Sequence, residues 1–151
     1  LVGVFDRAWV HPLAEAFSNL GSVHTLVVCS EDGLDEISIA SDTHVSELRD
    51  GSIRDYVITP EQFGVARQSL ASLVVGDAEE SCQMIRSALN GEPGPASDMV
   101  ALNAGATIYS ADLADSMEAG VERAKAILSS KAGAAKLDEL CAYTQQFTEQ
   151  D

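Results

Sequence analysis

The sequence predicts an α/β fold in which a mixed sheet, with a parallel βαβ start and a β-hairpin, is packed by C-terminal helices. Three observations predict it: a strand–helix–strand pattern in residues 1–29, a hairpin signal at Asp50-Gly51, and a helical pattern from Asp77 onward. Residues 1–151 contain no internal repeat, low-complexity stretch or linker. We therefore expect a single domain.

The βαβ unit is predicted by two apolar runs with an amphipathic helix between them. Residues 1–5 and 24–29 have the composition of strands, and the second run is nearly continuous, as in a strand covered on both faces. Asp6 can cap the helix, which should end near Leu20-Gly21. Apolar residues recur at helical spacing at Val10, Leu13, Ala14 and Phe17. Two strands joined in this way are expected to be parallel.

Turn and capping residues predict the remaining elements. Residues 43–48 and 53–58 flank Asp50-Gly51, a favoured hairpin turn, and residues 59–62 resemble a capping box before a short helix. Four further helices are expected. The first runs from Asp77 to Asn90-Gly91 and turns Cys82, Ile85 and Leu89 inward, and the second is an Ala- and Gly-rich helix within residues 98–110 that packs closely on a neighbour. The third is capped by Ser116, and the fourth carries Leu137, Leu140 and Cys141.

Composition excludes several classes of protein. The chain has 24 Asp and Glu against 9 Lys and Arg, a net charge of −15, so it lacks the basic surface that nucleic-acid binding needs. No apolar run approaches the ~20 residues of a membrane span, and no signal-peptide pattern opens the chain. The three scattered cysteines are typical of reduced, mostly buried thiols in a cytoplasmic protein. Because the chain starts at Leu1 inside a strand-like run, we expect a fragment.

The segment from Ser30 to Ser38 has the strongest chemical signal. Four carboxylates occur within six residues, at Glu31, Asp32, Asp35 and Glu36. Ligands of open α/β sheets bind beyond the carboxyl ends of strands, and adjacent carboxylates suit a hard cation such as Mg²⁺. The alternative interpretation is a solvated acidic turn.

Other catalytic patterns are missing from the sequence. It contains neither a P-loop nor a G-x-S-x-G motif. His11, His24 and His44 are isolated in sequence and are expected to have structural or surface roles, and Arg49 and Arg54 are expected to be solvated. No catalytic residue is therefore assigned within this chain.

Motif order then becomes informative, because several segments resemble the anthranilate phosphoribosyltransferase family over nearly the whole chain, from about Val2 to Leu140. The segments are residues 2–6, 27–38, 45–51, 59–64, 76–80, 91–95 and 102–104. The Gly-Leu-Asp-Glu loop at residues 33–36 and the run through Phe63-Gly64 favour this family over the related pyrimidine nucleoside phosphorylases, which share its architecture.

The resemblance implies a function. The family transfers the phosphoribosyl group of phosphoribosyl pyrophosphate to anthranilate in tryptophan biosynthesis, and it depends on Mg²⁺. In that family the residues matching Asp35 and Glu36 hold a magnesium ion on the diphosphate side. We accordingly expect a cytoplasmic homo-oligomer.

The chain also departs from the family pattern. Cys29-Ser30 stands where the family has His-Gly or His-Ser, which affects how the chain enters the loop but not the loop's carboxylates. The helical N-terminal domain, the phosphate loop, the Lys-His-Gly-Asn segment and the anthranilate-binding arginine have no counterpart here. The expected identity is therefore the C-terminal portion of a larger α/β domain, inactive alone. A nucleoside phosphorylase relative and a non-catalytic interaction domain are the alternatives.

Overall fold

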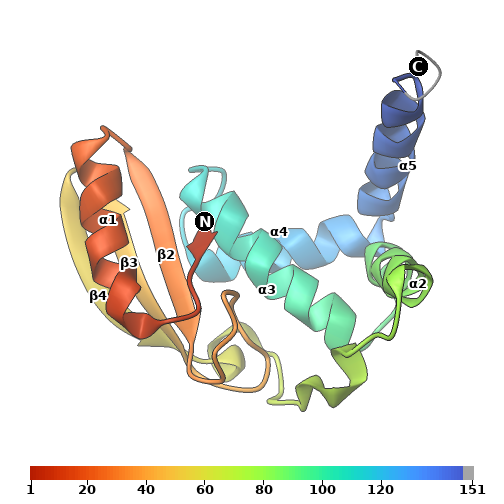
Figure 1. Ribbon diagram of the computed structural model, residues 1–151, viewed down its shortest axis with the longest axis horizontal. Coiled ribbons are helices and arrows are strands. Elements are labelled where there is room, and N and C mark those ends of the chain that lie inside the picture. Colours follow the sequence, from red (N-terminus) through yellow and green to blue (C-terminus); the bar gives the residue numbers. More distant parts are fainter. Residues whose placement is uncertain (148–151) are drawn as a thin grey trace.

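A four-stranded mixed sheet organises the first part of the chain in the computed structural model, which describes residues 1–147 (Figure 1). The strand order is β1-β2-β3-β4. The strands are β1 (Val2–Gly3), β2 (His24–Ser30), β3 (Thr43–Arg49) and β4 (Ser52–Ile58). β1 is parallel to β2, and the other two pairs are antiparallel. The predicted mixed sheet is confirmed.

The crossover between β1 and β2 covers one face of the sheet. It consists of a 3-10 turn, η1 (Arg7–Trp9), followed by helix α1 (Val10–Asn19), and the Asp6 carboxylate accepts the Ala8 N–H at its start. Val10 and Ala14 of α1 pack on Val27 and Cys29 of β2. Alternate residues of β2, among them Leu26 and Val28, face the opposite side. β2 is therefore covered on both faces, as its near-continuous apolar sequence predicts.

The hairpin has the turn that its sequence demands. Asp50 and Gly51 have φ values of 50° and 76°, and two consecutive positive φ angles match the twist of a tight hairpin. This turn sets the register that places Glu47 opposite Arg54. The capping box then opens the one-turn helix η2 (Pro60–Phe63), where Thr59 N–H donates to the Gln62 side chain at 2.9 Å.

The second face of the sheet packs on a pair of helices, α3 (Pro95–Ser110) and α4 (Met117–Ser129) (Figure 1). Their contact is close because small residues meet: Gly105 lies against Val121, and Gly120 lies against the Gly105 carbonyl. The described core cluster on this side includes Leu26, Val28, Ile37, Ile39 and Val45 from the sheet and its loop, and Leu102, Ala106, Tyr109, Met117 and Val121 from the helices.

The remaining helices lie beyond α3 and α4, away from the sheet (Figure 1). They are α2 (Ala78–Leu89) and α5 (Ala132–Gln145), whereas the 3-10 turn η3 (Leu70–Leu73) packs Leu70 and Leu73 against the core cluster. The inward orientation expected for α2 is wrong for two residues, because Cys82 is exposed and Ile85 is 49% exposed. α5 buries none of its residues, and Leu140 is 56% exposed. The reason is that neither helix packs against the sheet.

The cysteines are also less buried than expected. Cys29 is buried, Cys141 is partly buried, and all three thiols are free. Across the described part of the chain, no helix combines the length and apolarity that crossing a membrane requires.

Candidate metal-binding loop

The acidic segment is the loop that leaves β2 at its carboxyl end, and Asp32 organises it. The Asp32 carboxylate accepts hydrogen bonds from Ser30 Oγ at 2.5 Å, Ser38 Oγ at 2.6 Å and the Leu34 N–H at 3.3 Å. Burial raises the pKa of Asp32, but the hydrogen bonds from Ser30, Ser38 and Leu34 outweigh it and the pKa falls below its ordinary value. With its oxygens occupied in this way, Asp32 shapes the loop and is not a candidate ligand.

Asp35 and Glu36 have a different environment in the same loop. Both are exposed, and neither carboxylate forms a hydrogen bond or ion pair with any residue in the range 1–147. Burial of part of the Glu36 side chain raises its pKa, and the neighbouring charge of Asp35 raises it further. The pair thus carries a negative charge that the described residues leave uncompensated.

A second Asp-Glu pair in the chain makes the contrast clear. On α5, Asp138 accepts from Arg86 Nη1 at 2.8 Å, and Glu139 forms an ion pair with Lys136. The same two residue types are therefore engaged by cationic side chains at one place and left unpaired at the other. Unpaired adjacent carboxylates are a suitable donor set for a divalent cation.

The donor set that the described residues offer a metal ion is incomplete. Within residues 1–147, no group of three or more His, Cys, Asp and Glu side chains is arranged to hold a metal. Two carboxylates fit Mg²⁺, because this ion usually keeps several waters and binds through one or two carboxylates together with substrate phosphates. The loop can accordingly supply part of a magnesium site.

The position of the loop depends on Gly3. A Cβ atom at this position would lie 1.5 Å from the Asp35 carbonyl oxygen, so no other residue fits without moving the loop. An open cavity lies beyond the carboxyl ends of β1 and β2, lined by Phe5, Asp6, Arg7, Cys29, Ser30, Glu31, Gly33 and His44. Asp35 and Glu36 do not line this cavity. Ser30, the second residue of the Cys29-Ser30 pair that stands where the family has His-Gly or His-Ser, holds the loop entry through Asp32 and the Leu34 carbonyl.

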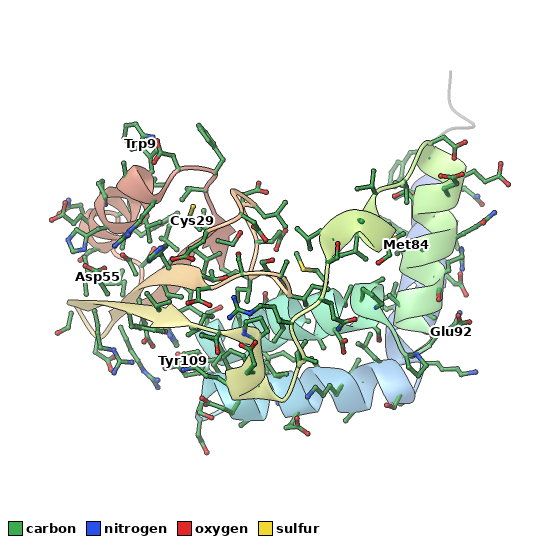
Figure 2. All side chains as sticks on the ribbon, turned by 90° about the horizontal axis from the view of Figure 1, so that it is seen from below. Trp9, Cys29, Asp55, Met84, Glu92 and Tyr109 are labelled. Carbon is green, nitrogen blue, oxygen red and sulfur yellow. The ribbon has the colours of Figure 1, made fainter. Side chains whose placement is uncertain are left out.

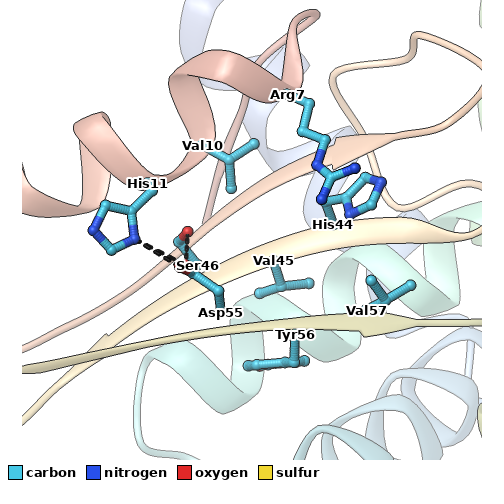
Figure 3. Close-up of a pocket in the computed structure, with 9 residues that line it drawn as sticks. All are labelled: Arg7, Val10, His11, His44, Val45, Ser46, Asp55, Tyr56 and Val57. Atoms are coloured by element: carbon cyan, nitrogen blue, oxygen red, sulfur yellow. Dashed lines mark hydrogen bonds and ion pairs between the residues drawn. The ribbon is translucent and has the colours of Figure 1, made fainter.

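A further cavity of about 270 Å³ lies between α1 and the edge strand β4 (Figure 3). His11 Nδ1 lies 2.8 Å from Asp55 Oδ2, and Ser46 Oγ also donates to the Asp55 carboxylate. His11 is therefore not isolated as its sequence suggests. A serine nucleophile is activated when its hydroxyl group hydrogen-bonds to a general base such as histidine. Because Ser46 and His11 both bond to Asp55, this arrangement does not supply one.

The sequence did not reveal a buried polar cluster on the α3 face of the sheet. Glu47 is 3% exposed and accepts hydrogen bonds from Tyr109 at 2.6 Å and from Arg54 at 2.8 Å. His24, which also looks isolated in sequence, lies with Nδ1 3.0 Å from Asp112. Tyr109 lies between α3 and the sheet (Figure 2), where its hydroxyl also accepts from Arg49 at 3.1 Å.

Arg49 and Arg54 are exposed, as expected, but each also bonds to a partner in this cluster that the sequence did not indicate. The hairpin register contains a signal for one of them, because the Asp50-Gly51 turn places Arg54 opposite Glu47. The contact of Arg49 with Tyr109 spans 60 residues and has no local signal. The cluster joins α3 to β3, and it is a structural feature rather than part of the acidic loop.

Comparisons with known proteins identify the family to which the sequence and fold are similar. Residues 1–136 match the family model described as "Glycosyl transferase family, a/b domain". The chain is 52% identical over 147 residues to the anthranilate phosphoribosyltransferase of Methylococcus capsulatus, covering 97% of this chain and 43% of that protein. It is 50% identical over 151 residues to the enzyme of the same name from Chromohalobacter salexigens, covering 100% of this chain and 44% of that protein.

Solved structures show the same fold. Anthranilate phosphoribosyltransferase from Thermus thermophilus superposes with a TM-score of 0.85 at 38% identity, covering 95% of this chain and 42% of that one. The Saccharomyces cerevisiae enzyme in complex with PRPP and Mg has a TM-score of 0.78 at 20% identity, covering 90% of this chain and 40% of that one. The chain thus spans less than half the length of these relatives. Because the family model covers most of its residues, the chain belongs to the glycosyl transferase family, and the match is to the α/β domain of that family.

Proposed function

We propose that residues 1–151 are a partial α/β domain, the C-terminal portion of an anthranilate phosphoribosyltransferase, and that Asp35 and Glu36 hold a Mg²⁺ ion for it. The observation that carries the proposal is the unpaired Asp35–Glu36 carboxylate pair in an otherwise well-bonded loop. The names of the two curated relatives described above support the substrates, which are phosphoribosyl pyrophosphate and anthranilate. They favour this reaction over that of a nucleoside phosphorylase and over a non-catalytic role.

The chemistry of the reaction explains why a carboxylate pair can help to bind the metal ion but cannot by itself bind the diphosphate. In the proposed reaction the bond from the anomeric carbon to diphosphate breaks, and its electron pair leaves with diphosphate. The anthranilate nitrogen forms the new bond to carbon and loses a proton. Bound Mg²⁺ would supply electrostatic stabilisation for the departing diphosphate. A pair of carboxylates can orient this ion but repels bare diphosphate, and the chain has a net charge of −15.

Metal binding and substrate binding would therefore be supplied by different parts of the enzyme. Asp35 and Glu36 would hold the ion from one side, while Asp32 and Gly3 keep their loop in place. The groups that bind phosphate and anthranilate would come from the portion of the relatives that this chain does not match. The yeast relative, which has the same fold, was solved with PRPP and Mg, and this supports the choice of ligand.

A chimera tests the proposal. The matching segment of the Methylococcus capsulatus enzyme, to which this chain is 52% identical, is replaced by residues 1–151. Loss of anthranilate fluorescence in the presence of phosphoribosyl pyrophosphate and Mg²⁺ reports turnover. We expect a folded, active chimera and no turnover by the 151-residue chain alone. A chimera with native circular dichroism and cooperative melting but no activity contradicts the proposal, and so does turnover by the isolated chain.

We also propose that the protein is cytoplasmic and forms homo-oligomers. Free thiols at Cys29, Cys82 and Cys141 support the compartment. The outer edge of β1 is unpaired within the described sheet, and Phe5 and Trp9, which follow β1 in the sequence, are exposed, which favours association. Multi-angle light scattering over a range of concentrations tests the oligomer, and a strictly monomeric mass contradicts it.

A further inference from the structure

One side chain outside the loop bonds directly to the backbone beside the carboxylate pair. Asn103 of α3 accepts the Ile37 N–H through Oδ1 at 2.9 Å and donates through Nδ2 to the Ile37 carbonyl at 2.9 Å. Its second amide hydrogen goes to the Met99 carbonyl at 3.0 Å. Every strong hydrogen-bonding group of the amide is thereby used, and the three contacts together fix its orientation.

This contact fixes the residue that follows Glu36. Two hydrogen bonds to the N–H and C=O of one residue restrain both position and rotation, as a pair of bonds does between neighbouring strands. The Ile37 side chain is 2% exposed and belongs to the core cluster. The chain is therefore held at Ile37 on the C-terminal side of the pair, and the Asp35 carbonyl, between the two residues of the pair, lies against Gly3.

The helix that carries Asn103 is itself firmly placed. Gly105, two residues along, packs so closely on α4 that an added Cβ would lie 2.5 Å from Val121 Cα. Leu102 and Ala106 are buried under the sheet. Asn103 thus projects from a rigid helix and meets the loop across 66 residues of sequence. Groups that hold a ligand-bearing segment in this way tune metal affinity without touching the metal.

We propose that Asn103 is a positioning residue for the cation site, acting through the Ile37 backbone to hold the Asp35 and Glu36 carboxylates in a binding arrangement. This inference rests on the proposed function, because it takes the pair to be a Mg²⁺ site. It adds that a side chain of α3, remote in sequence and not a ligand, sets the affinity of that site.

The first test uses the 151-residue chain and MgCl₂ as the probe. Amide chemical shifts of Asp35 and Glu36 give the Mg²⁺ dissociation constant, and hydrogen exchange gives the protection of the Ile37 N–H. Asn103→Ala and the similarly sized Asn103→Leu remove all three hydrogen bonds. Both should speed exchange at Ile37 and weaken Mg²⁺ binding by about tenfold, the lower end of the range for outer-sphere partners of metal ligands.

The matched control is Gln68→Ala. Gln68 is another side-chain amide that bonds to α3, through Nε2 to Asp98 at 2.7 Å, but its side chain forms no hydrogen bond with Ile37. This variant should keep the wild-type dissociation constant and Ile37 exchange rate. Asn103 variants that bind Mg²⁺ as the wild type does overturn the inference and leave the proposed function intact. A wild-type chain whose Asp35 and Glu36 shifts ignore Mg²⁺ overturns both.

A second measurement needs no variant. Coupling between two sites is reciprocal, so saturating Mg²⁺ should slow exchange of the Ile37 N–H in the wild-type chain. The Ala71 N–H, which bonds to the Ser69 side chain at 3.2 Å, serves as a reference that Mg²⁺ should leave unchanged. Equal effects of Mg²⁺ at Ile37 and Ala71 contradict a specific link between Asn103 and the site.

Discussion

The hydroxyl of Tyr109 donates a 2.6 Å hydrogen bond to the buried carboxylate of Glu47, and so connects α3 to β3. Burial alone would raise the pKa of Glu47. Hydrogen bonds from Tyr109, Arg54 and Tyr56 outweigh it and lower the pKa below its ordinary value. The helix that carries Asn103 is thus anchored to the sheet through a charged group that depends on its partners.

Tyr109→Phe should destabilise the fold. The substitution removes a donor from a carboxylate that is 3% exposed, and an incompletely bonded buried charge costs about 1–3 kcal/mol of unfolding free energy. Urea unfolding of the 151-residue chain measures this loss. Tyr143→Phe is the control, because Tyr143 is 59% exposed and its substitution should change the unfolding free energy little. Equal effects of the two substitutions would show that the contact with Glu47 contributes nothing.

Glu47 should also make the fold acid-sensitive. Its folded pKa lies below the unfolded value near 4.5, so its contribution to stability is present above pH 4.5 and is lost as pH falls through the folded pKa. In Glu47→Gln this contribution is missing. The wild-type melting temperature should therefore fall more steeply than that of Glu47→Gln as pH drops below 4.5. Parallel curves contradict the assignment.

Glu36 should show the opposite dependence. Its folded pKa is raised, so its contribution is favourable at low pH and is lost as pH rises through the folded pKa. Near neutral pH, without divalent cations, Glu36→Gln should melt at a higher temperature than wild type, and this difference should shrink in acid. Mg²⁺ should lower the Glu36 pKa, which carbon-13 NMR of the side-chain carboxyl group can measure. A Glu36 pKa unchanged by saturating Mg²⁺ speaks against binding at this pair.

Gly105→Ala should loosen the contact between α3 and α4. A Cβ at this position would lie 2.5 Å from the Val121 backbone, and overpacking of this kind costs about 1–3 kcal/mol even though alanine favours helix. Gly133→Ala on α5 is the control, because its Cβ would meet only the Leu89 side chain, at 3.1 Å. Urea unfolding should separate the two variants. Equal stability would show that close approach at Gly105 is not required.

Local sequence signals predicted most of the fold. The Asp50-Gly51 turn, the Ser116 cap and the buried stripe that begins at Met117 are confirmed. Burial on α2 was mispredicted at Ile85, because helical periodicity identifies an apolar stripe but not whether another element covers it.

The candidate site was predicted only in part, because local sequence does not show which residues meet in the folded chain. The position of the acidic loop after β2 followed from local sequence, and metal binding by Asp35 and Glu36 stays a prediction. The separation of Asp32 from that pair, by its bonds to Ser30 and Ser38, depends on the folded loop. The contacts of Asn103 with Ile37 and of Tyr109 with Glu47 join residues more than 60 positions apart, and only the tertiary fold reveals them.

The proposed binding of a catalytic Mg²⁺ ion by Asp35 and Glu36 is measured by the Mg²⁺ concentration that gives half-maximal activity in the chimera. Asp35→Asn with Glu36→Gln is compared with Asp138→Asn with Glu139→Gln, which changes the same residue types where Arg86 and Lys136 engage them. We expect a large rise in the required Mg²⁺ concentration for the first double variant and a wild-type value for the second. An unchanged Mg²⁺ requirement in the Asp35–Glu36 variant would contradict this expectation.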